Sequence, residues 1–229
     1  MAARFIAPAG SPAVALPERI PYAPPMVADP AKPFARRATY QDVLDAPPHL
    51  IAEVMNGELY LQPRPVIAHQ RASSELGIDL GGSVGRRGPP DGWLILDEPE
   101  LHLGSANDLD ILVPDLAGWR LSRLPKPPAT ANITLAPDWV CEVLSPGTEV
   151  RDRTLKLQIY AREGVGHLWF VSVQTRHIEV YRLDLETRLW TLLGTAYGDA
   201  KVRFAPFEEV ELELSRLWTE GLGEPPPTL

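Results

Sequence analysis

Residues 138–145 read Asp-Trp-Val-Cys-Glu-Val-Leu-Ser, an apolar stretch with one acidic residue near its centre. The apolar residues on both sides of Glu142 predict a buried β-strand over Trp139–Leu144. Burying a carboxylate in such a strand is unfavourable unless the carboxylate is paired or binds a metal ion. Glu142 is therefore either half of a buried ion pair with an arginine or part of a functional site.

A second stretch, residues 109–115, reads Leu-Asp-Ile-Leu-Val-Pro-Asp and predicts a strand over Leu109–Val113. Asp115 follows Pro114 at the end of this strand, where aspartate also occurs simply as a turn residue. If this strand and the Glu142 strand are neighbours, carboxylates within about 5 Å of each other repel, and the pKa of one rises. A divalent cation removes the repulsion, and oxygen ligands with open coordination positions suit Mg²⁺ or Mn²⁺.

Charged residues recur in the segment 151–160, which reads Arg-Asp-Arg-Thr-Leu-Lys-Leu-Gln-Ile-Tyr. Asp152, Lys156 and Tyr160 are spaced i, i+4 and i+8, so a helix places them on one face. A lysine beside carboxylates and a metal ion can hold an attacking water or stabilise a phosphoryl oxygen in the transition state. The same spacing fits a solvated Asp–Lys pair on a helix surface, with Asp152 as a helix N-cap.

The rest of the chain alternates between short helices and short strands. Two apolar stretches flank Asn56-Gly57 and predict a hairpin over Ile51–Leu61. The expected helices are Tyr40–Leu44 after Thr39, His69–Val84 with Gly81-Gly82 and Gly85 ending it, and Leu155–Glu163 before Gly164. Further strands are expected at Trp93–Leu96, Leu168–Val173, Ile178–Leu183 and Leu189–Leu193. This pattern indicates an α/β or α+β protein with a mixed central sheet.

Proline and charge are unevenly distributed. Eight of the 25 prolines lie in residues 1–37, which predicts an extended N-terminal arm, and residues 224–229 predict a short Pro-rich tail. The arm carries five basic and two acidic side chains, whereas the rest of the chain carries 17 basic and 28 acidic ones. Residues 38–223 are enough for a single domain that buries roughly 70% of its unfolded surface. An acidic body disfavours non-specific nucleic-acid binding but is compatible with a site that binds a cation.

Several classes of protein are excluded. One cysteine rules out a disulfide framework, and five scattered histidines without an i,i+4 pair disfavour a zinc site. The chain lacks an apolar run of membrane-spanning length and a Gly-rich phosphate loop. Its N-terminus does not have the pattern of an export signal, so a cytoplasmic location is expected.

The ordered set of motifs resembles the Uma-type restriction endonuclease family of the PD-(D/E)XK nuclease superfamily. The resemblance extends from Tyr40 to about Leu183. The matching segments are Glu53-Val54-Met55-Asn56-Gly57-Glu58, His69 at the start of a helix, Val113-Pro114-Asp115, Glu142-Val143-Leu144-Ser145-Pro146, Asp152 with Lys156 and Tyr160, Gly164-Val165, and Leu168-Trp169-Phe170-Val171. Each segment alone is common, but their order and spacing together are specific.

The resemblance implies a restriction-endonuclease-like core, a mixed central β-sheet flanked by helices, and Mg²⁺- or Mn²⁺-dependent cleavage of DNA phosphodiester bonds by water. If the roles of the family's motif residues hold at the matching positions of this sequence, Asp115 and Glu142 bind the metal, and Lys156 orients water or stabilises charge. Glu53 and His69 are possible supporting residues, as are Asp152 and Tyr160. One departure is that Leu144 stands where the superfamily's usual Glu-x-Lys string has its lysine. Lys156 must therefore reach the site from the following helix, as in the Uma-type family.

The oligomeric state, the function and the role of the basic residues remain open from the sequence. Cutting both strands of a duplex from one type of site favours a homodimer, by analogy. The acidic body and the lack of a DNA-reading module are compatible with a non-catalytic interaction or regulatory protein that retains the nuclease fold. Hydrolysis of another phosphoester is a third hypothesis for the function.

The basic residues near the predicted site either hold a phosphate backbone or balance the acidic body. These residues are Arg151, Arg153, Lys156 and Arg162.

Overall fold

The computed structural model describes residues 36–218, which contain all the helices and strands discussed below. Of the predicted N-terminal arm only Arg36 and Arg37 are described, and the predicted tail lies outside the described residues. None of the helices in residues 36–218 is both long and apolar enough to cross a membrane.

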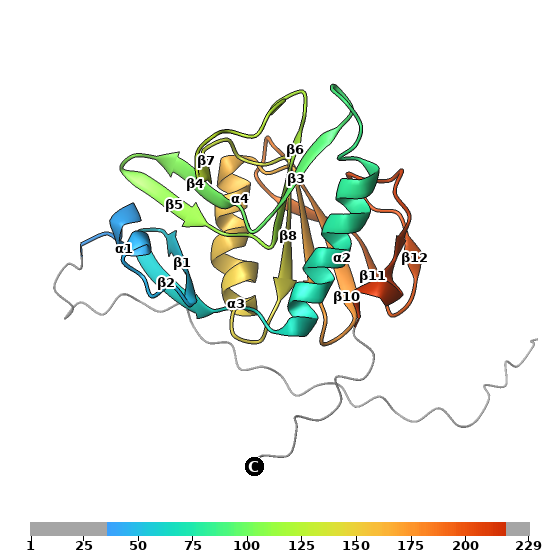
Figure 1. The fold of residues 1–229 in the computed structure, drawn as a ribbon, viewed down its shortest axis with the longest axis horizontal. Helices are drawn as coiled ribbons and strands as arrows, with labels where there is room; N and C mark the ends of the chain where they lie inside the picture. Colours follow the sequence, from blue (N-terminus) through green and yellow to red (C-terminus); the bar gives the residue numbers. More distant parts are fainter. Residues whose placement is uncertain (1–35, 219–229) are drawn as a thin grey trace, which may run out of the picture. The chain divides into compact units, whose positions relative to one another are not determined.

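A six-stranded mixed sheet forms the centre of the fold (Figure 1). In spatial order its strands are β11 (Trp190–Tyr197), β10 (His177–Leu183), β9 (His167–Ser172), β8 (Trp139–Leu144), β6 (Leu116–Arg120) and β3 (Trp93–Asp97). β8 and β9 are parallel, and the other neighbours are antiparallel. The predicted strand over Trp139–Leu144 is confirmed, and it lies in the interior of this sheet with every residue buried.

A second mixed sheet has five strands in the order β2, β1, β5, β4, β7. Their bounds are β2 (Glu58–Pro63), β1 (Leu50–Met55), β5 (Asp108–Leu112), β4 (Glu100–Ser105) and β7 (Asn132–Ile133). β1 and β2 form the predicted hairpin, in which Asn56 and Gly57 both have positive φ, as a two-residue hairpin turn requires. Two short strands, β12 (Lys201–Val202) and β13 (Leu212–Glu213), pair separately.

The helices are α1 (Tyr40–Leu44), α2 (Ile67–Ser83), α3 (Glu149–Arg151) and α4 (Leu157–Glu163), with a π-helix over Asp152–Lys156 and a 3₁₀-helix over Leu214–Leu217. α2 and α4 lie on opposite faces of β8, whereas α1 contacts β1. α3, the π-helix and α4 form one continuous helical run, which ends at Gly164 with the positive φ of a C-cap.

The alternation of side chains along β8 separates two hydrophobic cores. Trp139, Cys141 and Val143 pack in the core that contains α2, whereas Val140 and Leu144 pack in the core that contains α4. Figure 1 shows α2 and α4 on either side of β8. Because side chains alternate along a strand, Glu142 shares the face of Val140 and Leu144 and points towards the α4 side.

The predicted helix over His69–Val84 is confirmed as α2, which continues through Gly81-Gly82 and ends at Ser83. Leu76 and Leu80 hold it against the sheet, so burial outweighs the low helix propensity of the two glycines. Of the strands in the two large sheets, the pattern left β4, β6 and β7 unassigned, whereas it predicted β1, β2 and β5 of the second sheet. β6 contains Gly118 and follows directly on a Pro-Asp pair, which is a turn signal.

Two glycines give a matched test of this packing. A Cβ on Gly118 would lie 2.9 Å from Ile95 Cδ1 and 3.1 Å from Trp139 Cε3, whereas a Cβ on Gly81 has no atom within 4 Å. We expect Gly118→Ala to lower the free energy of unfolding by about 1–3 kcal/mol, since overpacking strains the core. Gly81→Ala should raise it by about 0.5–1 kcal/mol. Urea unfolding measures both, and equal effects would contradict the packing described.

Candidate active site

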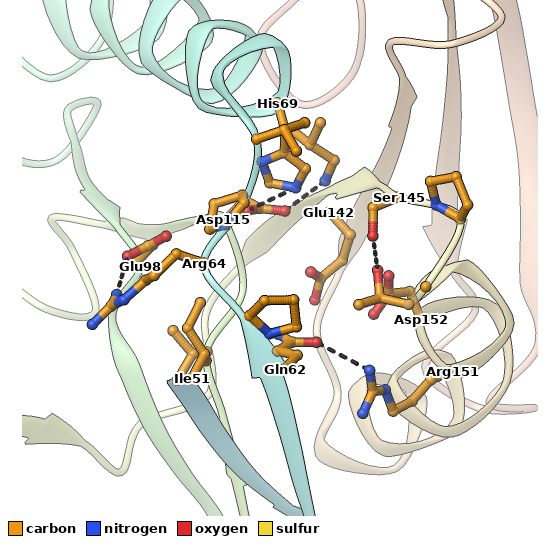
Figure 2. Close-up of a pocket in the computed structure, with 18 of the residues that line it drawn as sticks. Ile51, Gln62, Arg64, His69, Glu98, Asp115, Glu142, Ser145, Arg151 and Asp152 are labelled. Atoms are coloured by element: carbon orange, nitrogen blue, oxygen red, sulfur yellow. Dashed lines mark hydrogen bonds and ion pairs between the residues drawn. The ribbon is translucent and has the colours of Figure 1, made fainter. Parts of the chain in front are cut away.

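A cavity of about 320 Å³ lies between the β1–β2 hairpin, the start of α2, the end of β8 and the π-helix. Five of the seven residues predicted for the site line it: His69, Asp115, Glu142, Asp152 and Lys156. The first four are labelled in Figure 2. The other two, Glu53 and Tyr160, are fully buried and contact its lining residues. The structure therefore brings all seven together, although they come from segments far apart in the sequence.

The pairing of β6 with β8 brings Asp115 and Glu142 together. Leu116 is opposite Cys141 in this antiparallel ladder, so one further step places Asp115 opposite Glu142. The backbone N–H of Val143 donates to Asp115 Oδ2 at 2.7 Å and holds this carboxylate at the end of the ladder. His69 Nε2 lies 3.4 Å from the other oxygen, Asp115 Oδ1.

Lys156 is buried among carboxylates from three segments. Its Nζ lies 3.1 Å from Glu53 Oε1, 3.1 Å from Glu142 Oε2 and 3.5 Å from Asp152 Oδ1. Burial by itself lowers the pKa of an ammonium, but the negative charges of Glu142, Glu53 and Asp152 outweigh it and raise the pKa of Lys156 well above its usual range. Lys156 is therefore positively charged at neutral pH.

Glu142 has both of its carboxylate oxygens occupied. Tyr160 Oη donates to Oε1 at 2.6 Å, and Lys156 donates to Oε2 at 3.1 Å. Burial raises the pKa of Glu142, Lys156 opposes the rise, and the neighbouring carboxylates Asp152, Asp115 and Glu53 add to it. Burial and the charge of Glu142 likewise raise the pKa of Tyr160, so its hydroxyl keeps its proton and acts as a donor.

The cluster has more negative than positive groups. Four carboxylates, those of Glu53, Asp115, Glu142 and Asp152, surround the single ammonium of Lys156. Among residues 36–218 the buried Glu53 Oε2 finds no hydrogen-bond partner. An excess of oxygen donors in a cavity is the environment that attracts a hard divalent cation.

The donor set suits Mg²⁺ more than zinc. In the part of the chain that the structure describes, no group of three or more His, Cys, Asp or Glu side chains is arranged as a metal cage. Mg²⁺ does not need one, because it keeps several waters and is usually held by one or two carboxylates together with substrate phosphates. Asp115 and Glu142, opposite each other on neighbouring strands, provide two such carboxylates.

A π-helical turn carries Asp152 and Lys156. The sequence predicted an α-helix beginning at Leu155, whereas the helical run begins at Glu149, and its residues Asp152–Lys156 form a π-helix. The Leu157 N–H donates to the carbonyl of Asp152, five residues back. Asp152, Lys156 and Tyr160 still share one buried face. Single π-turns within α-helices often occur at functional sites, and local sequence carries no clear signal for them.

Arg153, on the outer side of the same turn, braces the turn against β10. Its Nη1 and Nη2 donate to the two oxygens of Glu179 at 2.8 and 2.9 Å, and its Nε donates to Glu149 at 2.9 Å. Burial alone would raise the pKa of Glu179, but hydrogen bonds from Arg153, Tyr181 and His177 lower it to about 2. Glu179 was not predicted, because its only local signal is a polar residue in the alternating strand 177–183.

Removing this brace has a pH-dependent consequence. Because the pKa of Glu179 falls from 4.5 in its ordinary state to about 2 in the folded protein, its stabilising effect is complete above pH 4.5 and is lost as the pH falls towards 2. We expect Glu179→Gln to lower the free energy of unfolding at pH 7 by on the order of 1–2 kcal/mol.

Urea unfolding at pH 7 and pH 3 measures this effect. The difference between Glu179→Gln and wild type should shrink at pH 3. Glu186→Gln, a control in the exposed β10–β11 loop, should stay within about 0.5 kcal/mol of wild type. A Glu179→Gln effect that is equal at both pH values would contradict the ion pair.

Comparisons with known proteins identify the fold. A crystal structure described as a "putative nuclease belonging to DUF820" from Anabaena variabilis superposes with a TM-score of 0.60. It is 23% identical, and the match covers 79% of this chain and 97% of that chain, which establishes a shared fold. No curated protein matches the chain.

The family follows from a second comparison. Residues 37–215 match the Uma2 family, which is described as "Putative restriction endonuclease", and the chain belongs to this family. The resemblance found in the sequence is therefore confirmed, as is the mixed α/β fold. The roles of the individual site residues stay predictions.

Proposed function

We propose that the protein is a metal-dependent endonuclease that hydrolyses DNA phosphodiester bonds. The observation that carries the proposal is the convergence of Asp115, Glu142 and Lys156 in one cavity. The family description supports DNA as the substrate. One protein chain provides one such cluster in its described residues. Cleavage of both DNA strands is therefore proposed to use a homodimer with two sites.

Asp115 and Glu142 are the residues proposed to hold the cation, Mg²⁺ or Mn²⁺. When bound, the cation supplies Lewis-acid polarisation of a phosphate oxygen and lowers the pKa of a coordinated water. The two carboxylates are already held in place. Val143 fixes one oxygen of Asp115, and Tyr160 fixes one oxygen of Glu142.

Lys156 is the second functional part of the proposal. Its ammonium stays charged because the surrounding carboxylates raise its pKa. A fixed positive charge in a cavity wall can donate a hydrogen bond to the attacking water or to a phosphoryl oxygen as negative charge develops there. Besides Glu142, the carboxylates of Glu53 and Asp152 also contact this ammonium, at 3.1 and 3.5 Å, and position it.

Conservative replacement of the two carboxylates tests the proposal. We expect Asp115→Asn and Glu142→Gln each to reduce Mg²⁺-dependent cleavage of duplex DNA at least about 100-fold, because each loses a charged oxygen proposed to bind the cation. The measurement is nicking and linearisation of plasmid DNA with Mg²⁺ or Mn²⁺. Glu186→Gln, which loses an exposed carboxylate elsewhere, should cleave as wild type does. Cleavage by folded Glu142→Gln at the wild-type rate would refute the assignment.

A second candidate function has its own supporting observation. Lys156 and Tyr160 already occupy both oxygens of Glu142, and residues 36–218 contain no metal cage of three or more ligands. This arrangement also suits a non-catalytic interaction or regulatory protein that retains the nuclease fold. Hydrolysis of a different phosphoester is a weaker reading, which substrate profiling tests.

Calorimetric titration with Mn²⁺ separates the first two functions. A nuclease site should bind the cation at millimolar or lower concentration, and Asp115→Asn should abolish the binding heat. Wild-type protein that binds no Mn²⁺ at millimolar concentration would favour the non-catalytic function.

A further inference from the structure

The structure assigns different environments to the four basic residues near the site. Three of them, Arg153, Lys156 and Arg162, are bound to carboxylates of the protein itself. Their partners are Glu149 and Glu179 for Arg153, Glu53, Glu142 and Asp152 for Lys156, and Asp110 and Glu163 for Arg162. A cation that is already paired within the protein binds a further anion less readily than an unpaired one, although Lys156 can still donate to an oxygen on which negative charge develops. The fourth residue, Arg151, is different.

Arg151 has no carboxylate partner within residues 36–218. It lines the cavity beside Asp152, and one guanidinium N–H donates to the side-chain oxygen of Gln62 at 3.0 Å (Figure 2). The guanidinium carbon lies 5.2 Å from the centre of the Tyr60 ring. Gln62 and Tyr60 therefore orient the guanidinium without neutralising its charge.

One donor of Arg151 has no acceptor within residues 36–218. Its Nε is buried and finds no hydrogen-bond partner among the described residues. Leaving a buried donor unsatisfied is unfavourable, and for a charged group more so. An anionic ligand in the cavity supplies the missing negative charge, and it can also accept from Nε if the side chain turns towards it.

The other arginine of the cavity does not share these features. Arg64 forms an ion pair with Glu98 at 3.5 Å, and its side chain is 56% exposed. Among the described cations that line the cavity, Arg151 is thus the one without a carboxylate partner.

We infer that Arg151 binds a phosphate group of the substrate, with Gln62 and Tyr60 as positioning residues. The planar guanidinium presents parallel donors that match phosphate oxygens, which a lysine does not. Arg151 directly precedes Asp152 in the chain, so the phosphate it binds lies in the same cavity as the acidic cluster. The inference rests on the proposed function, in which the ligand is a nucleic-acid backbone.

Binding of duplex DNA by the full-length protein in EDTA, followed by fluorescence anisotropy, tests the inference. We expect Arg151→Gln to weaken binding about tenfold or more, since one charge-assisted contact is lost. The slope of log K against log salt concentration should fall by about 0.9, the value for one phosphate contact. Arg182→Gln is the matched control, because Arg182 is exposed on β10 outside the cavity. If folded Arg151→Gln keeps the wild-type affinity and salt slope, the inference is wrong.

A second variant leaves Arg151 untouched. Gln62→Glu places a carboxylate where the amide now accepts its hydrogen bond, so Arg151 acquires an internal counter-ion. We expect DNA binding to weaken by a factor similar to that of Arg151→Gln, with the protein as stable as wild type or more so. Unchanged binding by Gln62→Glu would count against a phosphate at Arg151.

Inorganic phosphate alone separates this inference from the proposed function. Phosphate should raise the thermal midpoint of the wild-type protein by mass action, relative to chloride of equal ionic strength, and Arg151→Gln should lose the rise. If this holds while the wild type neither binds nor cleaves DNA, the anion site stands and the nuclease proposal fails. A rise that Arg151→Gln retains, or no rise together with no DNA binding, overturns the inference.

Discussion

The buried ammonium of Lys156 is the group on which the arrangement of the site depends. Taking an ammonium out of water costs several kcal/mol, so it is tolerated only where carboxylates surround it. Those carboxylates come from β1, β8 and the π-helix. The two sheets and the helical run must therefore meet at one point, and the cavity forms where they do.

Stability alone does not explain this cluster. Well-packed apolar residues of similar volume are often as stabilising as a buried ion network, or more so. Here four carboxylates face one ammonium, and burial and repulsion raise the pKa of Glu142. Strongly shifted pKa values in a cavity are typical of functional sites. The excess of negative charge is what a bound cation would balance, while Arg151, on the same cavity wall, has no carboxylate partner within residues 36–218.

Local pattern predicted those elements whose structure depends on local interactions. The strand at Trp139–Leu144 follows from its apolar run, and the β1–β2 hairpin from Asn56-Gly57, because only a few residues are needed to specify each. The helix over His69–Val84 was predicted from its apolar spacing, and it continues through Gly81-Gly82 because contacts with the sheet outweigh propensity there. The π-helix at Asp152–Lys156 was not predicted at all. Its residue Arg153 binds Glu179, a strand residue that lies 26 positions away and that local pattern does not connect with it.

The sequence by itself determined the spacing of Asp152, Lys156 and Tyr160 on one helical face and the burial of Glu142 in a strand, since helix and strand periodicities are properties of neighbouring residues. It also sufficed for the family, through the order of the motifs. Only the tertiary structure decided which cations are neutralised. Arg153 and Arg151 look equivalent along the chain, yet one meets a carboxylate and the other an uncharged glutamine. The strength of a charge depends on its partners in space, and those partners are brought together by long-range packing rather than by local pattern.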